Sequence, residues 1–480
     1  MQLSELLANV PHRLVNGDAE ITGIAYDSRA EIAVGDLFCC IVGTALDGHM
    51  YAEDAYRRGA AALLVERELP IAIPQAIVGN ARIAMATVAA GFYGNPSREL
   101  KTVGVTGTNG KTSVTYMVKA IAERAGKKVG VIGTIKNTIG DEVLFTSSRT
   151  TPESVPLQAT LRKMADAAVD IVVMEVSSSA LDQYRTYGVE FDVAAFTNLT
   201  QDHLDYHKTF EHYRDSKKRL FYQCRHAVMN VDDANAEYMM ADIPCAVTTT
   251  AICNEAGIMA SDIELNSSGV QFTMHTAAGD TAISIPIPGL FTVKNAVVAA
   301  GIALELGFTP GIVREALANV GSIEGRLEPL PTGGRGFNVY LDFAHTPDAL
   351  QNVLTTVSQF AEGRVIALFG CGGDKDKAKR AMMGEIAGRF SDFVVLTSDN
   401  PRTENPRDII AMVEEGVRRT AVPYVVIESR REAIRYALQH GRSGDCIILA
   451  GKGHEDYQEI NGVKHHFDEK EVVAELLLEI

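Results

Sequence analysis

The sequence lacks any run of 18 apolar residues, so we predict no membrane-spanning segment. Its first residues, Met1–Glu5, also lack the basic and apolar stretches of a secretory signal peptide. Positive charge is scarce, because 45 lysines and arginines stand against 61 aspartates and glutamates, a formal net charge of −16. That balance argues against a nucleic-acid or anionic-membrane surface, although a local basic pocket for phosphate groups fits it.

Cysteine is sparse and carries no metal-site pattern. The seven cysteines show neither a Cys-x-x-Cys pair nor a zinc-like spacing; they are Cys39, Cys40, Cys224, Cys245, Cys253, Cys371 and Cys446. Their odd number and mostly apolar neighbours predict buried free thiols in a reducing cytoplasm. With 46% hydrophobic and 22% charged residues, the composition is that of a globular protein with an ample core.

The chain has 480 residues, enough for about three domains, which we place at 1–98, 99–323 and 324–480. Predicted strands and helices alternate in the second and third segments, which is typical of a mostly parallel sheet with crossover helices. We therefore predict an α/β fold, with one antiparallel stretch at 262–285. The predicted strands are 21–26, 37–42, 62–65, 75–78, 103–106, 129–133, 171–176, 193–197, 226–231, 339–343, 365–369, 393–397, 424–427 and 446–450, and the predicted helices include 50–58, 82–93 and 114–124.

The strongest motif is a glycine-rich turn between a predicted strand and a predicted helix, Gly107-Thr108-Asn109-Gly110-Lys111-Thr112-Ser113. Glycines let backbone N–H groups turn towards an anion, and the helix N-terminus adds the positive end of its dipole. Lys111 can reach the outer phosphates of a nucleotide, and the Thr112 or Ser113 hydroxyl can bind magnesium. The strict pattern needs glycine at position 105, where this chain has Val105, so the motif is a variant phosphate loop. We predict ATP binding.

Polar side chains follow two further strands of the central segment. Glu175 lies near the end of the apolar stretch 170–176, where it is either a magnesium ligand or a capping or surface carboxylate. The polar turn 197–207 contains His203, Asp202 and Asn198, which suit contact with a metal ion or a phosphate. Ligands of open α/β sheets gather at such strand ends.

Lys217 has two interpretations. With Tyr213, Leu220 and Phe221 it falls at helical spacing, which places it on an apolar helix face. The residues alone favour a lysine stem that lies on apolar surface while its ammonium extends to solvent. The alternative is a buried lysine whose lowered pKa leaves a neutral amine that can be modified.

Four polar turns follow four strands of the third segment. They are 342–348, 370–377, 399–402 and 451–455, and each contains a glycine or a proline. Because the strands are expected to be parallel, these turns should meet at one edge of the sheet and form the rim of one site.

Together these motifs resemble the Mur ligase family, ATP-dependent enzymes that form amide bonds in peptidoglycan precursor synthesis. The resemblance runs from Asp27-Ser28-Arg29 to Gly451-Lys452-Gly453-His454-Glu455. It implies an N-terminal uridine-nucleotide-binding α/β domain, a central phosphate-loop ATPase domain and a C-terminal Rossmann-like domain. The implied substrates are ATP, UDP-N-acetylmuramoyl-L-alanyl-D-glutamate and meso-2,6-diaminopimelate, the implied ion is Mg²⁺, and the implied state is a monomer.

The resemblance also implies roles for individual residues. ATP would be held by Gly107–Ser113 with Asn295 and His345, and Arg326 would lie near its phosphates. Magnesium would be bound by Thr112, Glu175, His203 and Lys217, the last as a carbamate formed with CO₂ (N6-carboxylysine). The muramoyl dipeptide nucleotide would contact Tyr26, Ser28, Thr44, Ala45, Leu46, Thr150, Thr151, Ser177, Gln183 and Arg185. The diamino acid would contact Lys375, Asp399, Asn400, Pro401, Arg402, Gly451 and Glu455.

Three residues depart from the pattern common in the family. Ser179 stands where many relatives have histidine, Phe343 replaces a common tyrosine, and Lys375 replaces a common arginine. The last exchanges a two-pronged carboxylate contact for a point charge. Alternatives to the diaminopimelate-adding activity are an L-lysine-adding or permissive ligase, a folylpolyglutamate-synthetase-like ligase, and an ATP-binding module without catalysis.

Overall fold

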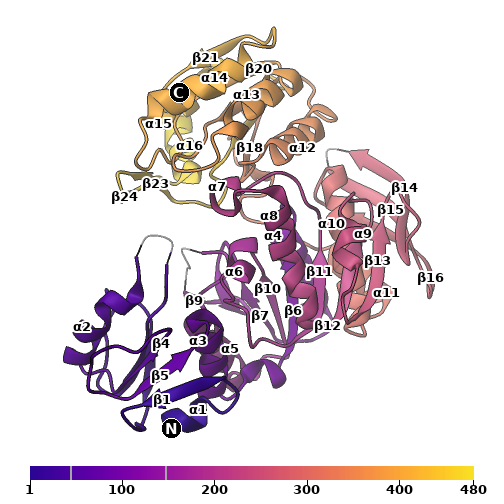
Figure 1. Cartoon of the computed structure of the whole chain (residues 1–480). Helices are drawn as coiled ribbons and strands as arrows, with labels where there is room; N and C mark the ends of the chain where they lie inside the picture. The colour runs from indigo at the N-terminus through magenta and orange to yellow at the C-terminus, as the bar shows by residue number, and fades with distance from the viewer. Residues whose placement is uncertain (44–45, 146–148, 267) are drawn as a thin grey trace.

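The computed structural model describes residues 1–43, 46–145, 149–266 and 268–480. Three groups of elements follow one another from the indigo N-terminal part through the magenta centre to the orange and yellow C-terminal part (Figure 1). The main sheet of each group is built from strands of one predicted segment, and the boundaries after residues 98 and 323 remain predictions. Among the described residues, no helix is long and apolar enough to cross a membrane.

The first sheet has five strands in the order β1-β5-β4-β3-β2, with β1 antiparallel to its neighbour. Its strands are β1 (His12–Val15), β2 (Gly23–Ala25), β3 (Asp36–Cys39), β4 (Ala62–Val65) and β5 (Gln75–Val78). The helical elements are α1 (Leu3–Leu6), η1 (Gly48–Tyr51), α2 (Ala52–Arg57), α3 (Ala81–Phe92) and η2 (Pro96–Arg98). Asn80 caps the N-terminus of α3, because its side-chain oxygen accepts hydrogen bonds from the backbone N–H groups of Arg82 and Ile83.

The central sheet has eleven strands in the order β16-β15-β14-β13-β12-β11-β6-β10-β7-β8-β9. Seven strands from β14 to β7 are parallel, and antiparallel strands flank them on both sides, which confirms the predicted antiparallel stretch. The strands are β6 (Lys101–Thr106), β7 (Val129–Ile132), β8 (Asn137–Ile139), β9 (Glu142–Phe145), β10 (Ile171–Glu175), β11 (Phe191–Phe196), β12 (Cys224–Asn230), β13 (Ala246–Ala251), β14 (Ile258–Asn266), β15 (Gly269–Thr276) and β16 (Gly279–Ile285).

Helices cover both faces of the central sheet. One face packs against α4 (Lys111–Arg124), α10 (Leu290–Glu305) and α11 (Pro310–Leu317). The other packs against α5 (Ser154–Asp166), α8 (Phe210–Lys218) and η3 (Arg219–Tyr222). The remaining helices of this part are α6 (Ser178–Asp182), α7 (Leu204–His207) and α9 (Ala236–Met240). Because both faces are covered, β7 and β10 are buried along their whole length.

The third sheet has the order β17-β18-β22-β19-β20-β21, parallel except for β17. Its strands are β17 (Glu328–Leu330), β18 (Asn338–Asp342), β19 (Val365–Phe369), β20 (Phe393–Leu396), β21 (Tyr424–Val426) and β22 (Cys446–Ala450), and a hairpin follows of β23 (Tyr457–Ile460) and β24 (Val463–His466). Helices α12 (Pro347–Ser358), α13 (Ala378–Phe390) and α14 (Pro406–Val417) cover one face, and α15 (Arg430–His440) and α16 (Glu469–Glu479) cover the other.

Two details differ from the sequence predictions. Helix α8 ends at Lys218, so Leu220 and Phe221 lie in the 3₁₀ turn η3 rather than on the same α-helix as Lys217. All seven cysteines are free, but Cys253 is exposed, so the prediction of buried thiols is wrong there. Its loop follows β13 at the surface, where an apolar neighbour in sequence does not ensure burial.

Candidate active site

The predicted phosphate loop lies between β6 and α4. Gly107 and Gly110 have positive φ angles of 154° and 88°. A side chain at these two positions would overlap the hydroxyl of Thr197 and the side-chain oxygen of Asn295, so only glycine fits. Lys111 folds back over the loop, where its ammonium donates to the carbonyl oxygens of Gly107 at 3.0 Å and Thr108 at 2.8 Å.

Glu175 ends β10 beside this loop. Its carboxylate accepts hydrogen bonds from the hydroxyls of Thr112 and Thr134, both at 3.0 Å, and from the Thr134 backbone N–H at 2.9 Å. The residue is only 1% exposed. The interpretation of Glu175 as a surface carboxylate is therefore wrong, and the three side chains gather hard oxygen donors of the kind that Mg²⁺ prefers.

Lys217 is also buried, at 1% exposure. Its ammonium donates to the Gly107 carbonyl at 2.8 Å and lies 4.6 Å from the centre of the Tyr213 ring. The interpretation of an ammonium that extends to solvent is wrong, because α8 packs this side chain inward against the loop. Burial and the nearby charge of Lys111 hold the pKa of Lys217 well below its usual value.

The phosphate loop, Glu175 and Lys217 line one cavity of about 360 Å³. Residues predicted for four different roles meet there, namely contact with ATP, magnesium, the muramoyl dipeptide and the diamino acid. The predicted residues on its wall are Thr108, Asn109, Gly110, Lys111, Thr112, Thr150, Glu175, Ser177, Arg185, His203, Lys217, Arg326, His345 and Lys375.

His203 begins α7 with a left-handed backbone, φ 56°, and its side chain is 47% exposed. The neighbouring carboxylate of Asp202 is buried and lies 3.3 Å from the His203 ring. Asp202 also faces two groups of the C-terminal part, the Lys379 ammonium at 3.4 Å and the His345 ring at 3.9 Å. This carboxylate therefore links the central and C-terminal parts at the site.

A second cavity, of about 270 Å³, lies on the α10 side of the loop. Five residues predicted for ATP contact line it: Asn109, Gly110, Ser113, Asn295 and Arg326. The Asn109 amide donates to the Asp348 carboxylate of α12 at 2.8 Å, so this cavity also spans the two parts. His345, predicted near the nucleotide, lies instead in the cavity around Lys111.

Arg326 follows Gly325, whose φ is 65°. Its guanidinium donates to the Thr112 hydroxyl at 3.0 Å and lies 4.9 Å from the centre of the Phe343 ring. A side chain at Gly325 would overlap the backbone of Gly453 and His454. The chain thus brings a cation from the start of the C-terminal part onto the phosphate loop.

The residues predicted for the muramoyl dipeptide form a polar group near β10. Arg185 donates to the Thr151 carbonyl at 3.1 Å and to the Gln183 side chain at 2.8 Å. The Thr151 hydroxyl accepts from the Ser177 N–H at 3.0 Å, and the Thr150 hydroxyl contacts that of Thr134 at 3.1 Å. The structure therefore brings these side chains to the rim next to Glu175.

The predicted uridine contacts lie in the first part of the chain. Tyr26 is half-buried, and burial together with the charge of Glu153 raises its pKa. Ser28 accepts a hydrogen bond from Arg58 through its carbonyl at 2.6 Å, and Leu46 is 63% exposed. Thr44 and Ala45 lie outside the described residues.

The four turns of the third segment meet as predicted, around a cavity of about 150 Å³. Six of the seven residues predicted for the diamino acid line it: Lys375, Asp399, Asn400, Arg402, Gly451 and Glu455. It shares Asp202, His203, Phe343, His345 and Lys375 with the cavity around Lys111, so the two are continuous. The seventh residue, Pro401, lines a different cavity.

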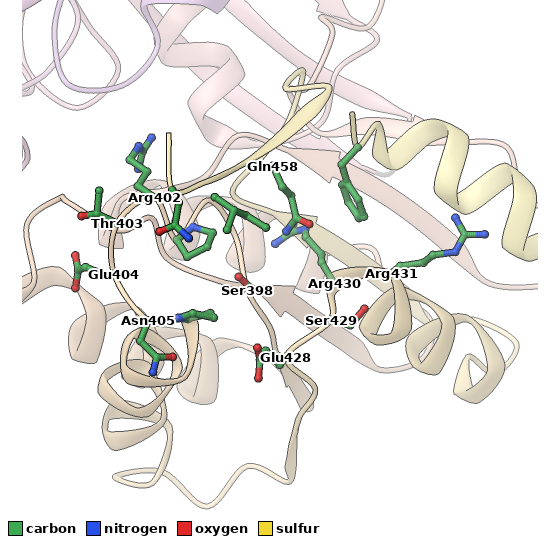
Figure 2. A pocket seen from close by; sticks show the side chains of 15 residues that line it. Ser398, Arg402, Thr403, Glu404, Asn405, Glu428, Ser429, Arg430, Arg431 and Gln458 are labelled. Carbon is green, nitrogen blue, oxygen red and sulfur yellow. The ribbon is translucent and has the colours of Figure 1, made fainter. Parts of the chain in front are cut away.

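That other cavity, of about 720 Å³, is lined by residues of segment 398–403 (Figure 2). Arg402 lines both cavities, and Arg430 and Gln458 enter this one from α15 and the hairpin. The Arg402 guanidinium donates to the Gly373 carbonyl at 2.8 Å and lies 3.3 Å from the Glu459 carboxylate. Arg402 therefore separates the two cavities, and its side chain is fixed by contacts with Gly373 and Glu459.

Comparison with known proteins agrees with this architecture. The sequence matches the Mur ligase family catalytic domain over residues 20–91, the Mur ligase middle domain over 105–303 and the Mur ligase glutamate ligase domain over 325–453. A curated relative from Caldanaerobacter subterraneus subsp. tengcongensis is 47% identical over 483 residues, covering 100% of this chain and 99% of the relative. The chain belongs to the Mur ligase family.

That relative is named UDP-N-acetylmuramoyl-L-alanyl-D-glutamate--2,6-diaminopimelate ligase, as is one from Geobacillus thermodenitrificans that is 44% identical over 98% of both chains. A solved structure of an enzyme with that name superposes on this Mur ligase with a TM-score of 0.68 at 32% identity, covering 96% of this chain and 95% of the other. Mycobacterium tuberculosis folylpolyglutamate synthase, at 19% identity and a TM-score of 0.65, shares the fold.

Sequence reasoning missed several residues that line these cavities. Asn198 and Asp202, in the polar turn after β11, were expected only as part of a group that suits a metal ion or a phosphate, and neither was given a role of its own. Asn230, Lys294 and Asn352 line the cavity beside α10, and Lys379 lines the smaller cavity. No motif marks these four, because elements far apart in sequence bring them together.

Proposed function

We propose that this Mur ligase is an ATP-dependent acid–amino-acid ligase that adds meso-2,6-diaminopimelate to UDP-N-acetylmuramoyl-L-alanyl-D-glutamate. The observation that carries the proposal is the continuity of two cavities. One contains the phosphate loop and Glu175, and the other contains Asp399, Arg402 and Glu455. An activated carboxylate formed in the first can be attacked by an amine held in the second without leaving the protein.

The reaction takes place in two steps. The D-glutamyl γ-carboxylate attacks the γ-phosphorus of ATP, ADP leaves, and an acyl phosphate forms. The amine of the incoming amino acid then attacks the acyl carbon, phosphate leaves, and the amine loses a proton. Phosphoryl transfer depends mainly on positioning and electrostatic stabilisation, which Lys111 on the loop carbonyls and Arg326 on the Thr112 hydroxyl would supply.

The oxygen donors around Glu175 fit magnesium, which Thr112, Glu175 and His203 would hold, and a carbamylated Lys217 would be a ligand of a second magnesium ion. When bound, Mg²⁺ offsets negative charge on the transferring phosphoryl group. Lys217 has the properties that carbamylation needs, since burial and the nearby Lys111 favour its neutral amine. Addition of CO₂ to that amine gives a carboxylate next to the phosphate loop.

Closure of the two parts keeps water from the acyl phosphate. Asn109 and Asp348 join across the nucleotide cavity, and Asp202 and Lys379 join at the second one. These contacts form only when the C-terminal part lies against the central part, so the described arrangement is a closed one. Hydrolysis of the intermediate is then slower than attack by the bound amine.

The test is direct. The purified protein is incubated with ATP, Mg²⁺, the UDP-muramoyl dipeptide and either meso-diaminopimelate, L-lysine or L-glutamate, and the product is identified by mass. We expect the mass of the diaminopimelate adduct and one ADP per product. Equal ligation of L-lysine would show a lysine-adding or permissive ligase, and ATP binding without any ligation would show a catalytically inactive module.

A further inference from the structure

The diamino-acid cavity contains two acidic side chains close together. Asp399 follows β20, Glu455 follows β22, and both line the cavity. Burial raises the pKa of Glu455, and the negative charge of Asp399 raises it further. A carboxyl group that takes up a proton cannot pair with a substrate ammonium, so something must hold Glu455 in its ionised form.

Lys452 is placed to do this. Its side chain is 0% exposed and does not line the cavity, and its ammonium lies behind the two residues that do. The ammonium is 3.3 Å from the Asn400 side-chain oxygen and 3.3 Å from a Glu455 carboxylate oxygen. The same Glu455 oxygen accepts from the Asn400 amide at 2.8 Å, so the three groups form a closed triangle.

The surroundings of the triangle leave the ammonium few other partners. The side-chain oxygen of Asn400 also accepts a hydrogen bond from the Glu459 backbone N–H at 3.0 Å. This contact fixes the orientation of the Asn400 amide group. The centre of the Tyr457 ring lies 5.5 Å from the Lys452 ammonium. A further buried cation, Arg430, is already paired with Glu469 at 2.7 Å and lies 3.8 Å from Asp399.

We propose that Lys452 is a positioning residue for the diamino acid, because its buried ammonium orients Asn400 and keeps Glu455 ionised towards the cavity. The Glu455 carboxylate would then bind the distal ammonium of the diamino acid, and Arg402 would bind the carboxylate on the same distal carbon. Lys452 itself touches no substrate. The inference rests on the proposed function, since it assumes that the cavity holds the incoming amino acid.

The charged and titratable groups that face Glu455 set the sign of the pH dependence. They include Asp399 after β20, Lys452 and Tyr457 from the chain around the hairpin, and Arg430 from α15. Lys375, Lys379 and Arg402 line the same cavity. Of all these groups, Lys452 lowers the pKa of Glu455 and Asp399 raises it. Loss of Lys452 should therefore shift the titration of Glu455 to higher pH.

The experiment compares Lys452→Met and Lys452→Arg with the unmodified enzyme. We expect Lys452→Met to raise the KM for meso-diaminopimelate by about tenfold to hundredfold, as for a lost hydrogen bond to a charged group. The KM for ATP and the kcat at saturating amino acid should change less than about threefold. Between pH 6.5 and 8.5 the KM of the variant should fall as pH rises, whereas Lys452→Arg should stay close to the unmodified enzyme.

A double-mutant cycle separates positioning from a merely structural role. If Lys452 acts through Glu455, Glu455→Gln and Lys452→Met/Glu455→Gln should have nearly the same KM for the diamino acid. Additive effects, or an unchanged KM and pH profile in Lys452→Met, would overturn the inference. Should Lys452→Met not fold, Lys452→Gln, which retains a polar side chain without the charge, must show the same pH dependence. Failure of the unmodified enzyme to ligate meso-diaminopimelate would instead count against the proposed function.

Discussion

Lys111 and Lys217 donate to the same oxygen atom, the carbonyl of Gly107, at 3.0 and 2.8 Å. Two ammonium groups that share one acceptor repel each other, and burial strengthens that repulsion because the local dielectric is low. The pKa of each lysine is lowered, mainly by burial. Conversion of Lys217 to a carbamate would replace this repulsion with attraction and would add two oxygen donors beside the loop.

The first prediction therefore concerns Lys217. Lys217→Ala should lower ligation by about 10²–10³-fold, the scale of one lost electrostatic stabiliser, while the far-UV circular dichroism spectrum stays unchanged. Added formate or acetate should restore part of the activity by filling the space of the carbamate. The matched control is Lys218→Ala, because the Lys218 ammonium faces the Tyr238 ring instead of the loop. Turnover of Lys217→Ala equal to that of the unmodified enzyme would exclude the carbamate.

The second prediction concerns Lys111. Its ammonium now lies on two loop carbonyls, and we expect it to turn to the phosphates when ATP binds. Lys111→Ala should reduce kcat by about 10²–10³-fold, since the lost charge acts mainly in the transition state. Lys119→Ala on the same helix, where the lysine pairs with Glu123, is the control. A variant that kept its kcat and lost only ATP affinity would show that Lys111 is a ground-state contact.

The third prediction concerns stability. Arg430 and Glu469 have side chains that are 0% exposed and pair at 2.7 Å between α15 and α16. Glu469→Ala leaves the guanidinium buried without that partner, so the unfolding free energy of the C-terminal part should fall by about 3–5 kcal/mol. Urea unfolding followed by circular dichroism measures this, because the chain has no tryptophan for fluorescence. Glu471→Ala, on the exposed side of α16, should change the midpoint little.

The double variant Arg430→Met/Glu469→Met tests the physical reason. Replacing both charges with apolar groups removes the buried charge as well as the pair, so most of the lost stability should return. A double variant as unstable as Glu469→Ala would show that the hydrogen bond from Arg430 to the Ala450 carbonyl, and not the ion pair, carries the stability.

Some of this site could be predicted because the signal is local. The turn 107–113 and the polar ends of β18, β19, β20 and β22 carry their residue types within a few positions of a strand, and parallel strands bring such ends together. The burial of Lys217 could not be predicted in this way. It depends on the end of α8 and on a carbonyl 110 residues earlier in the chain, and helical spacing equally allowed an exposed ammonium.

Contacts between distant segments were also beyond the sequence. The Asp202 carboxylate meets Lys379, 177 residues later, only because the C-terminal part closes on the central part. Likewise the hairpin at 457–466 was not predicted, since its residues are half-buried or exposed and show no clear alternation. Yet the hairpin holds segment 399–402 through the backbone of Glu459 and the side chain of Gln458.

The last prediction concerns the choice of amino acid. Meso-diaminopimelate differs from L-lysine by a carboxylate on its distal carbon, and Arg402 offers a planar guanidinium that can bind a carboxylate with two parallel hydrogen bonds. Its orientation is fixed in advance by the Gly373 carbonyl and the Glu459 carboxylate, and its backbone is held at φ 52°. L-lysine would leave this partly buried cation without a substrate partner.

A site built for a polar group can reject an analogue that lacks it by up to ~10⁴–10⁵-fold, so we expect kcat/KM for L-lysine to be lower by several orders of magnitude. Arg402→Ala should reduce kcat/KM for meso-diaminopimelate far more than kcat/KM for any residual reaction with L-lysine, because L-lysine has no distal carboxylate for the guanidinium to bind. Arg407→Ala is the matched control, since Arg407 lies only five residues later with a side chain that is 81% exposed. Comparable kcat/KM for both amino acids in the unmodified enzyme would refute the assignment. Equal losses for both substrates in Arg402→Ala would mean that Arg402 supports the shape of the cavity and does not recognise the distal carboxylate.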